Sequence, residues 1–154
     1  MTEVPSLSEF EHKVGMNFFD HQLKAFAGAH DLGPSGRLCL YFPTGKGKSI
    51  TSLVCVAQMG YMRAQVIAPP ATHDGWLATA RRLGMEIDLM SHAKFRMKGT
   101  KLHKDWPIIA DEFHLFGGPP AEQGKRDPIR IGLCHQMIRQ DDAGGALIRI
   151  EGER

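Results

Sequence analysis

The sequence predicts an α/β domain with a doubly wound, mainly parallel sheet and helices on both faces. Short, nearly continuous apolar runs suit strands that are buried on both faces of a parallel sheet. Such runs occupy residues 38–42, 65–68, 87–90 and 108–110. Helical patterns separate these runs, and alternation of strand and helix is typical of doubly wound folds. A chain of 154 residues has room for one such domain and is too short for two.

The expected helices lie at residues 20–30, 48–59, 73–83 and 92–97. In the second helix, Ile50 and Leu53 stand at helical spacing, and Gly60 follows as a C-terminal cap. In the third, Asp74 is expected to cap the start. Trp76 belongs to the apolar face of that helix, which favours core packing, and stacking on a nucleic-acid base is the alternative.

The regular pattern weakens after Phe116. Residues 128–133 are a candidate for a fifth strand, whereas the alternating residues 147–150 are left unplaced. The sequence therefore predicts a single lobe over residues 1–140. A C-terminal tail over residues 141–154 follows, and its order stays open.

Composition and charge exclude several classes of protein. Lysine and arginine number 19 against 17 aspartate and glutamate residues, a formal net charge of +2, and 42% of the chain is hydrophobic. This balance excludes a disordered chain and a polybasic tail. No apolar run reaches the roughly 18 residues of a membrane helix, and the polar start shows no signal peptide. Cys39, Cys55 and Cys134 are odd in number and lack metal-ligand spacing, which suits a reducing compartment. Together with the absence of a membrane helix, this leads us to expect a cytoplasmic protein without a membrane partner.

A glycine-rich loop between an apolar run and an amphipathic helix is the strongest motif. It consists of Pro43, Thr44, Gly45, Lys46, Gly47, Lys48 and Ser49. Its glycines allow backbone N–H groups to surround phosphate oxygens, and the start of the next helix adds a positive dipole end. Lys48 is expected to reach the β- and γ-phosphates of ATP, and the Ser49 hydroxyl to bind Mg²⁺. Phe42 stands where such loops usually begin with Gly or Ala.

An apolar run that ends in Asp111 and Glu112 is the second motif. Beside a phosphate loop, Asp111 is expected to hold Mg²⁺ through water. Glu112 is expected to polarise the water that attacks the γ-phosphate. The alternative is an acidic strand end that caps the next turn.

The phosphate loop and the Asp-Glu-Phe-His motif together resemble the first RecA-like lobe of superfamily-two helicases and translocases of the DExH type, including phage-encoded ones. The resemblance covers residues 18–118 and implies an ATP-binding, DNA-translocating motor lobe that uses Mg²⁺, in the host cytoplasm if a phage encodes it. It implies that Gln22 contacts adenine, although Phe19 and His21 replace the usual Arg and Tyr nearby. It also implies that His114 links the nucleotide to the nucleic-acid site.

The same resemblance implies two segments that contact the nucleic-acid backbone. Their residues are Pro69 and Pro70 in one segment, and Ser91, His92 and Lys94 in the other. A basic run without acids extends the second segment and comprises Lys94, Arg96, Lys98, Lys101 and Lys104. Such a run suits sequence-independent phosphate binding, and an ordinary solvated loop is the alternative.

Two parts of the family's motor are missing from this sequence. Residues 131–136 replace the Ser-Ala-Thr motif that couples hydrolysis to movement, and the second lobe with its arginine fingers is absent. We therefore expect weak or partner-dependent ATP hydrolysis, with a separate polypeptide supplying the second lobe. A non-catalytic nucleic-acid-binding or regulatory module is the alternative. A small-molecule kinase with lid arginines in residues 125–139 is a third hypothesis.

Overall fold

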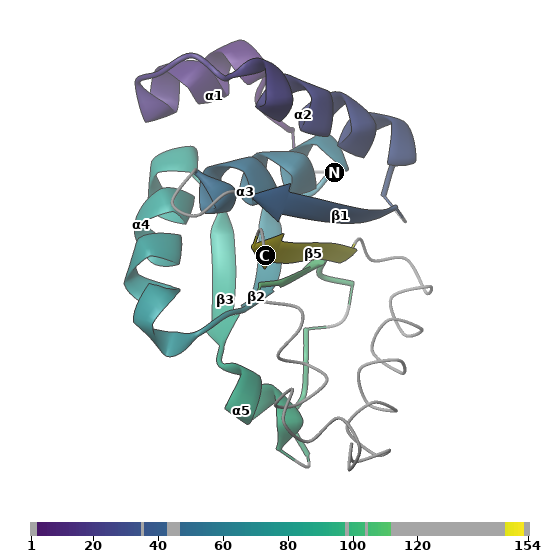
Figure 1. Ribbon diagram of the computed structural model, residues 1–154, viewed down its shortest axis with the longest axis vertical. Helices are drawn as coiled ribbons and strands as arrows, with labels where there is room; N and C mark the ends of the chain where they lie inside the picture. Colours follow the sequence, from purple (N-terminus) through teal and green to yellow (C-terminus); the bar gives the residue numbers. More distant parts are fainter. Residues whose placement is uncertain are drawn as a thin grey trace.

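Parallel strands form the sheet of this α/β domain, which confirms the α/β class and the parallel sheet that the sequence predicts (Figure 1). The computed structural model describes residues 3–34, 36–42, 47–97, 99–103, 105–111 and 147–152. In these residues the strands are β1 (Arg37–Phe42), β2 (Arg63–Ile67), β3 (Glu86–Met90), β4 (Ile108–Ala110) and β5 (Leu147–Gly152). The helices are α1 (Leu7–Val14), α2 (Asp20–Leu32), α3 (Lys48–Gln58), α4 (His73–Leu83) and α5 (His92–Arg96), with the 3-10 turn η1 (Pro70–Thr72).

Capping residues explain where several helices begin and end. The Ser6 hydroxyl accepts a hydrogen bond from the Glu9 amide at 3.2 Å and starts α1, which the sequence did not predict because its residues are mostly polar. Gly84 ends α4 with φ +72°, a left-handed conformation that favours glycine. The capping role predicted for Asp74 is wrong, since α4 already begins at His73 and Asp74 lies in its first turn. There its negative charge faces the positive end of the helix dipole.

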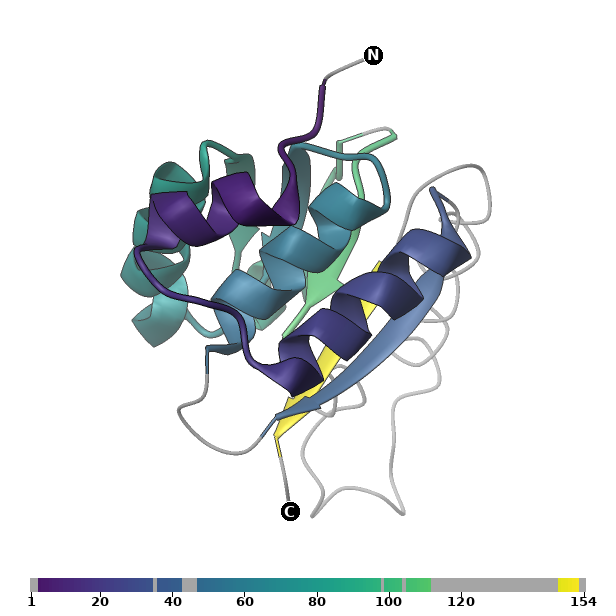
Figure 2. The ribbon, with the colours of Figure 1, turned by 90° about the horizontal axis from the view of Figure 1, so that it is seen from above.

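Helices α1 to α4 cover one face of the sheet (Figure 2). Alternate strand residues such as Ala64, Val66 and Ile109 point into this layer, where they meet Leu53 of α3 and Trp76 of α4 in one buried cluster. Trp76 is only 2% exposed, which confirms its prediction as a core residue. No helix in the described ranges is long and apolar enough to cross a bilayer.

The opposite face of the same strands carries a second, smaller apolar cluster. Ile67, Ile108 and Ala110 belong to it, and Phe95 of α5 packs against them. Neighbouring residues of a strand point to opposite faces, so Ile67 and Val66 enter different clusters. Burial on both faces explains why these strands appear in the sequence as nearly continuous apolar runs.

The strands follow the order β1-β5-β4-β2-β3, and each pairs in parallel with its neighbours. The alternating residues that the sequence left unplaced thus form β5, between β1 and β4. Their register pairs Phe42 with Gly152 on one side and Ala110 with Arg149 on the other. The strand predicted at residues 128–133 lies outside the described residues.

Cys55 gives a pH-dependent prediction about stability. Its thiol is fully buried in α3, and burial raises the pKa of the thiol from 9.0 to about 12. Above pH 9 the unfolded chain loses this proton while the folded chain keeps it, so the native state loses stability as the pH rises. We expect the difference in unfolding free energy between the wild type and Cys55→Ala to shrink by about 2 kcal/mol from pH 8 to 10.5. Urea titrations at both pH values measure it, and a constant difference contradicts the expectation.

Candidate functional site

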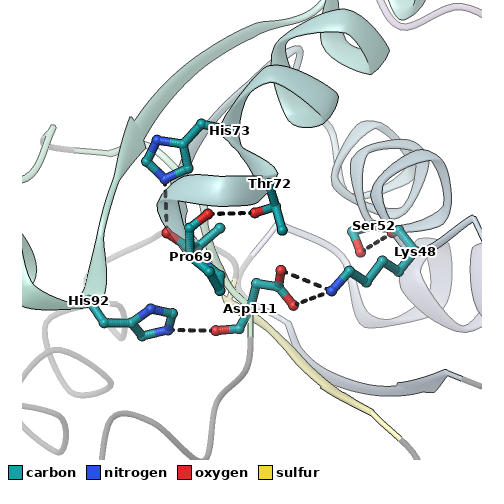
Figure 3. A network of polar contacts seen from close by, with 8 residues as sticks. Lys48, Ser52, Pro69, Thr72, His73, His92 and Asp111 are labelled. Atoms are coloured by element: carbon teal, nitrogen blue, oxygen red, sulfur yellow. Dashed lines mark hydrogen bonds and ion pairs between the residues drawn. The ribbon is translucent and has the colours of Figure 1, made fainter. Parts of the chain in front are cut away.

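The candidate site lies where the carboxyl ends of β2, β3 and β4 meet the start of α3 (Figure 3). In open parallel sheets, ligands bind at this edge because the loops after neighbouring strands converge there. Asp111 directly follows β4, Ala68 follows β2, and Ser91 follows β3. Three of the segments that the sequence singled out therefore share one edge of the sheet.

An ion pair between Lys48 and Asp111 is the centre of this site. The Lys48 ammonium lies 3.2 Å from each carboxylate oxygen of Asp111 (Figure 3). The Asp111 side chain is fully buried, whereas one third of the Lys48 side chain is exposed. Asp111 also donates its backbone N–H to the Ile67 carbonyl at 2.9 Å, which anchors it to β2. A buried carboxylate needs such a cation, because an unpaired charge is costly to remove from water.

The start of α3 is held by a chain of hydrogen bonds that begins in α2. Gly47 precedes the helix with φ +64°, a left-handed conformation that suits glycine. The Thr51 hydroxyl donates to the Gly47 carbonyl at 2.9 Å and accepts from the Gln22 amide at 3.0 Å. The Gln22 carbonyl oxygen in turn accepts from the Phe19 N–H at 2.9 Å. Gln22, expected to contact adenine, is thus buried and supports Gly47 at the end of the glycine-rich loop.

Hydroxyl groups line the first turn of α3. The Ser52 hydroxyl donates to the Lys48 carbonyl at 2.6 Å (Figure 3). The Ser49 hydroxyl lies 3.4 Å from the Thr79 hydroxyl of α4. Ser49, the expected magnesium ligand, therefore lies between α3 and α4 at the turn that also carries Lys48.

The predicted nucleic-acid segment after β2 forms a compact turn. The Thr72 hydroxyl donates to the Pro69 carbonyl at 2.7 Å, and the His73 ring lies 2.8 Å from the Ala68 carbonyl. Because a carbonyl oxygen only accepts, that ring nitrogen carries a hydrogen. Pro69 is half-buried and Pro70 is exposed, so Pro70 is the more accessible of the two predicted contacts.

The predicted segment after β3 divides into an exposed and a buried part. The Ser91 hydroxyl accepts from the Lys94 backbone N–H at 3.0 Å and caps α5, and the Lys94 side chain is exposed. His92 is 7% exposed, and its Nε2 lies 2.7 Å from the Asp111 carbonyl oxygen. Lys94 is thus placed to meet a ligand from solvent, whereas His92 faces the site.

A stacked cluster holds part of the basic run against the sheet. The His103 and Trp106 rings stack at 4.0 Å between centroids, and the Arg63 guanidinium lies 5.1 Å from the Trp106 ring. His103 also pairs with the Asp88 carboxylate at 2.7 Å. Lys101, between α5 and this cluster, is exposed. Lys101 thus presents its charge to solvent on a chain segment that is held near Trp106.

Several predicted residues lie outside the described part of the chain. They are Pro43, Thr44, Gly45, Lys46, Glu112 and His114, and also Lys98 and Lys104 of the basic run. Among the others, the structure brings Lys48, Asp111 and His92 together and places Gln22 behind Gly47. Sequence reasoning missed Thr51 and Thr79. Thr51 had a signal, because a threonine in a helix often bonds to the carbonyl four residues earlier.

Replacing Gln22 tests its supporting role. The Gln22→Leu variant leaves the Phe19 N–H and the Thr51 hydroxyl without this buried partner, so we expect the unfolding free energy to fall by about 1–3 kcal/mol. Gln58→Leu on α3, where the side chain is only half-buried, is the matched control and should change it by less than about 0.5 kcal/mol. Urea denaturation measures both variants, and equal losses contradict a special role for Gln22.

Two comparisons with known proteins found no match. No protein-family model matches this chain, and no curated protein matches it. Function is therefore inferred from the residues at the sheet edge, above all from Lys48, Asp111 and His92.

Proposed function

We propose that the chain is a RecA-like, doubly wound nucleotide-binding lobe that binds ATP with Mg²⁺ and contacts nucleic acid. The observation that carries this proposal is the pairing of Lys48 with the buried Asp111 across the edge of the sheet. Lys48 follows a glycine at the start of a helix, and Asp111 directly follows a buried strand. A phosphate-binding lysine and a magnesium-binding aspartate need these two positions.

The order of the strands supports the doubly wound part of the proposal. Along the chain, β1, β2 and β3 proceed across the sheet in one direction, and β4 and β5 return in the other. Because connections between parallel strands are right-handed, a reversal of direction moves the connections to the opposite face. Phe95 on that opposite face agrees with this winding.

The donor atoms at the site fit a magnesium ion. Mg²⁺ prefers oxygen ligands and is commonly held by one or two protein groups together with phosphates and waters. The Ser49 hydroxyl and the Asp111 carboxylate are the groups that would hold it. No cluster of three or more His, Cys, Asp or Glu occurs in the described ranges, and this mode of binding needs none. When bound, Mg²⁺ neutralises charge on the phosphates during transfer.

Each residue has a defined task in this proposal. Lys48 would hold the β- and γ-phosphates of ATP, and the Asp111 carboxylate would hold Mg²⁺. Glu112 polarises the attacking water, and His114 relays the state of the site to nucleic acid. Lys94 and Pro70, both exposed, contact the nucleic-acid backbone, for which DNA is the proposed substrate. Hydrolysis by the residues of this lobe on their own is weak, and it rises when a second lobe supplies arginine fingers.

ATP hydrolysis and binding test the proposal. The wild-type chain should bind a fluorescent ATP analogue in Mg²⁺ and lose this binding in EDTA. Lys48→Ala should weaken binding and hydrolysis by about 100-fold, the scale of losing a charge-assisted phosphate contact. Lys24→Ala is the matched control, because Lys24 is an exposed lysine of α2. Rates are measured with and without single-stranded DNA.

The same measurements distinguish the proposed function from its main alternative. Equal nucleotide binding by the wild type and Lys48→Ala would overturn the enzymatic proposal. Salt-dependent DNA binding that ignores nucleotide and survives Lys48→Ala would instead favour a non-catalytic nucleic-acid-binding or regulatory module.

A further inference from the structure

His92 connects the exposed part of α5 with the end of β4. Its side chain is 7% exposed, and its Nε2 lies 2.7 Å from the Asp111 carbonyl oxygen (Figure 3). A carbonyl oxygen only accepts, so His92 is the donor in this hydrogen bond. Buried hydrogen bonds of this kind fix geometry, because breaking one leaves a polar group without a partner.

The hydrogen bond acts on the peptide group that carries the candidate chemistry. The Asp111 carbonyl belongs to the planar unit that joins Asp111 to Glu112. The backbone N–H of Asp111 is anchored to Ile67 at 2.9 Å, and its carboxylate is held by Lys48 at 3.2 Å. His92 of α5 adds a further contact, at the carbonyl oxygen of the same residue.

The other side of α5 faces solvent and carries positive charge. Lys94 is exposed, two residues beyond His92, and its backbone N–H is bonded to the Ser91 cap. Phe95 packs against the second apolar cluster and so attaches the helix to the sheet. The whole helix has five residues, so a ligand that pulls on Lys94 acts on a short unit that includes His92.

We propose that His92 is a positioning residue that transmits nucleic-acid binding at α5 to Asp111 at the end of β4. This inference rests on the proposed function and names a means of regulating the same site. Nucleic acid and magnesium nucleotide then raise each other's affinity by the same factor, as linkage requires. Removing the donor of His92 lowers this mutual effect, while Lys48 and Lys94, the proposed contacts to phosphate and to nucleic acid, stay in place.

The test measures this coupling directly in the full chain. The affinity for a fluorescent single-stranded oligothymidine is determined by anisotropy, with and without saturating Mg²⁺ and a non-hydrolysable ATP analogue. We expect the analogue to tighten DNA binding of the wild type by about 5-fold or more. In His92→Leu the ratio should fall close to one. His92→Gln, whose amide places a donor near the position of Nε2, should restore most of it.

Two controls separate positioning from packing. Phe95→Leu loosens the seat of α5 but keeps His92, so it should retain the coupling. Melting temperatures of all variants report folding, and rescue by His92→Gln is an effect that lost packing alone does not produce. If His92→Leu does not fold, His92→Asn replaces it, because its shorter amide falls short of the Asp111 carbonyl.

The outcomes distinguish this inference from the proposed function. If the ATP analogue does not bind the wild type, both fail. If nucleotide and DNA both bind but the analogue leaves the DNA affinity unchanged, the coupling role of His92 is overturned and the proposed function stands. The coupling role is likewise overturned if His92→Leu keeps the full ratio, or if Phe95→Leu loses it equally.

Discussion

Alanine at position 76 is expected to lower the unfolding free energy by about 3–5 kcal/mol, the usual cost of removing a large aromatic side chain from a core. Trp76 is 2% exposed and lies among the residues that join α4 to the sheet and to the neighbouring helices. Removing the indole leaves a cavity that the surrounding residues fill only in part. Urea denaturation measures the loss.

The neighbouring Leu77 provides the matched control. Leu77 is 41% exposed on the same helix, so Leu77→Ala should cost less than about 0.5 kcal/mol. A Trp76→Ala chain that keeps the full unfolding free energy of the wild type would contradict the core role of this side chain.

The ion pair at the sheet edge is expected to show strong energetic coupling. Lys48→Met removes the cation from a fully buried carboxylate, and we expect a loss of about 1–3 kcal/mol in unfolding free energy. This loss is smaller than the about 3–5 kcal/mol for breaking a fully buried pair, because one third of the Lys48 side chain is exposed and water screens its charge. Asp111→Asn removes the other charge, so the double variant should lose less than the sum of the single losses.

A double-mutant cycle in EDTA isolates this coupling from any effect of bound metal. A coupling energy of about 0.5–3 kcal/mol is expected for groups in direct contact. Lys24→Met makes the same change of charge at an exposed position of α2 and should cost little. Additive losses for Lys48→Met and Asp111→Asn, within about 0.5 kcal/mol, contradict the pairing.

Much of the fold follows from periodicity in the sequence. The strand at Ile108–Ala110 and the helix at His73–Leu83 were predicted with their observed bounds. A strand buried on both faces leaves a continuous apolar run, whereas a helix buried on one face leaves apolar residues at helical spacing. Helix α1 escaped prediction because its polar residues hide the two that are buried, Phe10 and Val14. The place of β5 also escaped, since pairing between strands far apart in sequence leaves no local signal.

Residues of the site could be predicted from the sequence where the proposed chemistry requires one type of side chain. Lys48 and Asp111 were singled out from their motifs, and their contact follows from parallel strands that end at one edge. The partners of Gln22 and His92 were not predictable, because a sequence pattern does not say whether a polar side chain faces solvent or the interior. Both are buried and bonded to groups in other segments of the chain.

The position of β5 has a consequence for how the molecule assembles. β1 pairs with β5 in the described sheet, and β5 separates it from β4, so the strand before the phosphate loop joins the sheet only through residues 147–152. During synthesis, β2, β3 and β4 can pair early, whereas β1 must wait for a partner about a hundred residues later. Contacts over such distances in sequence slow folding. The sheet is therefore complete only once β5 bridges β1 and β4.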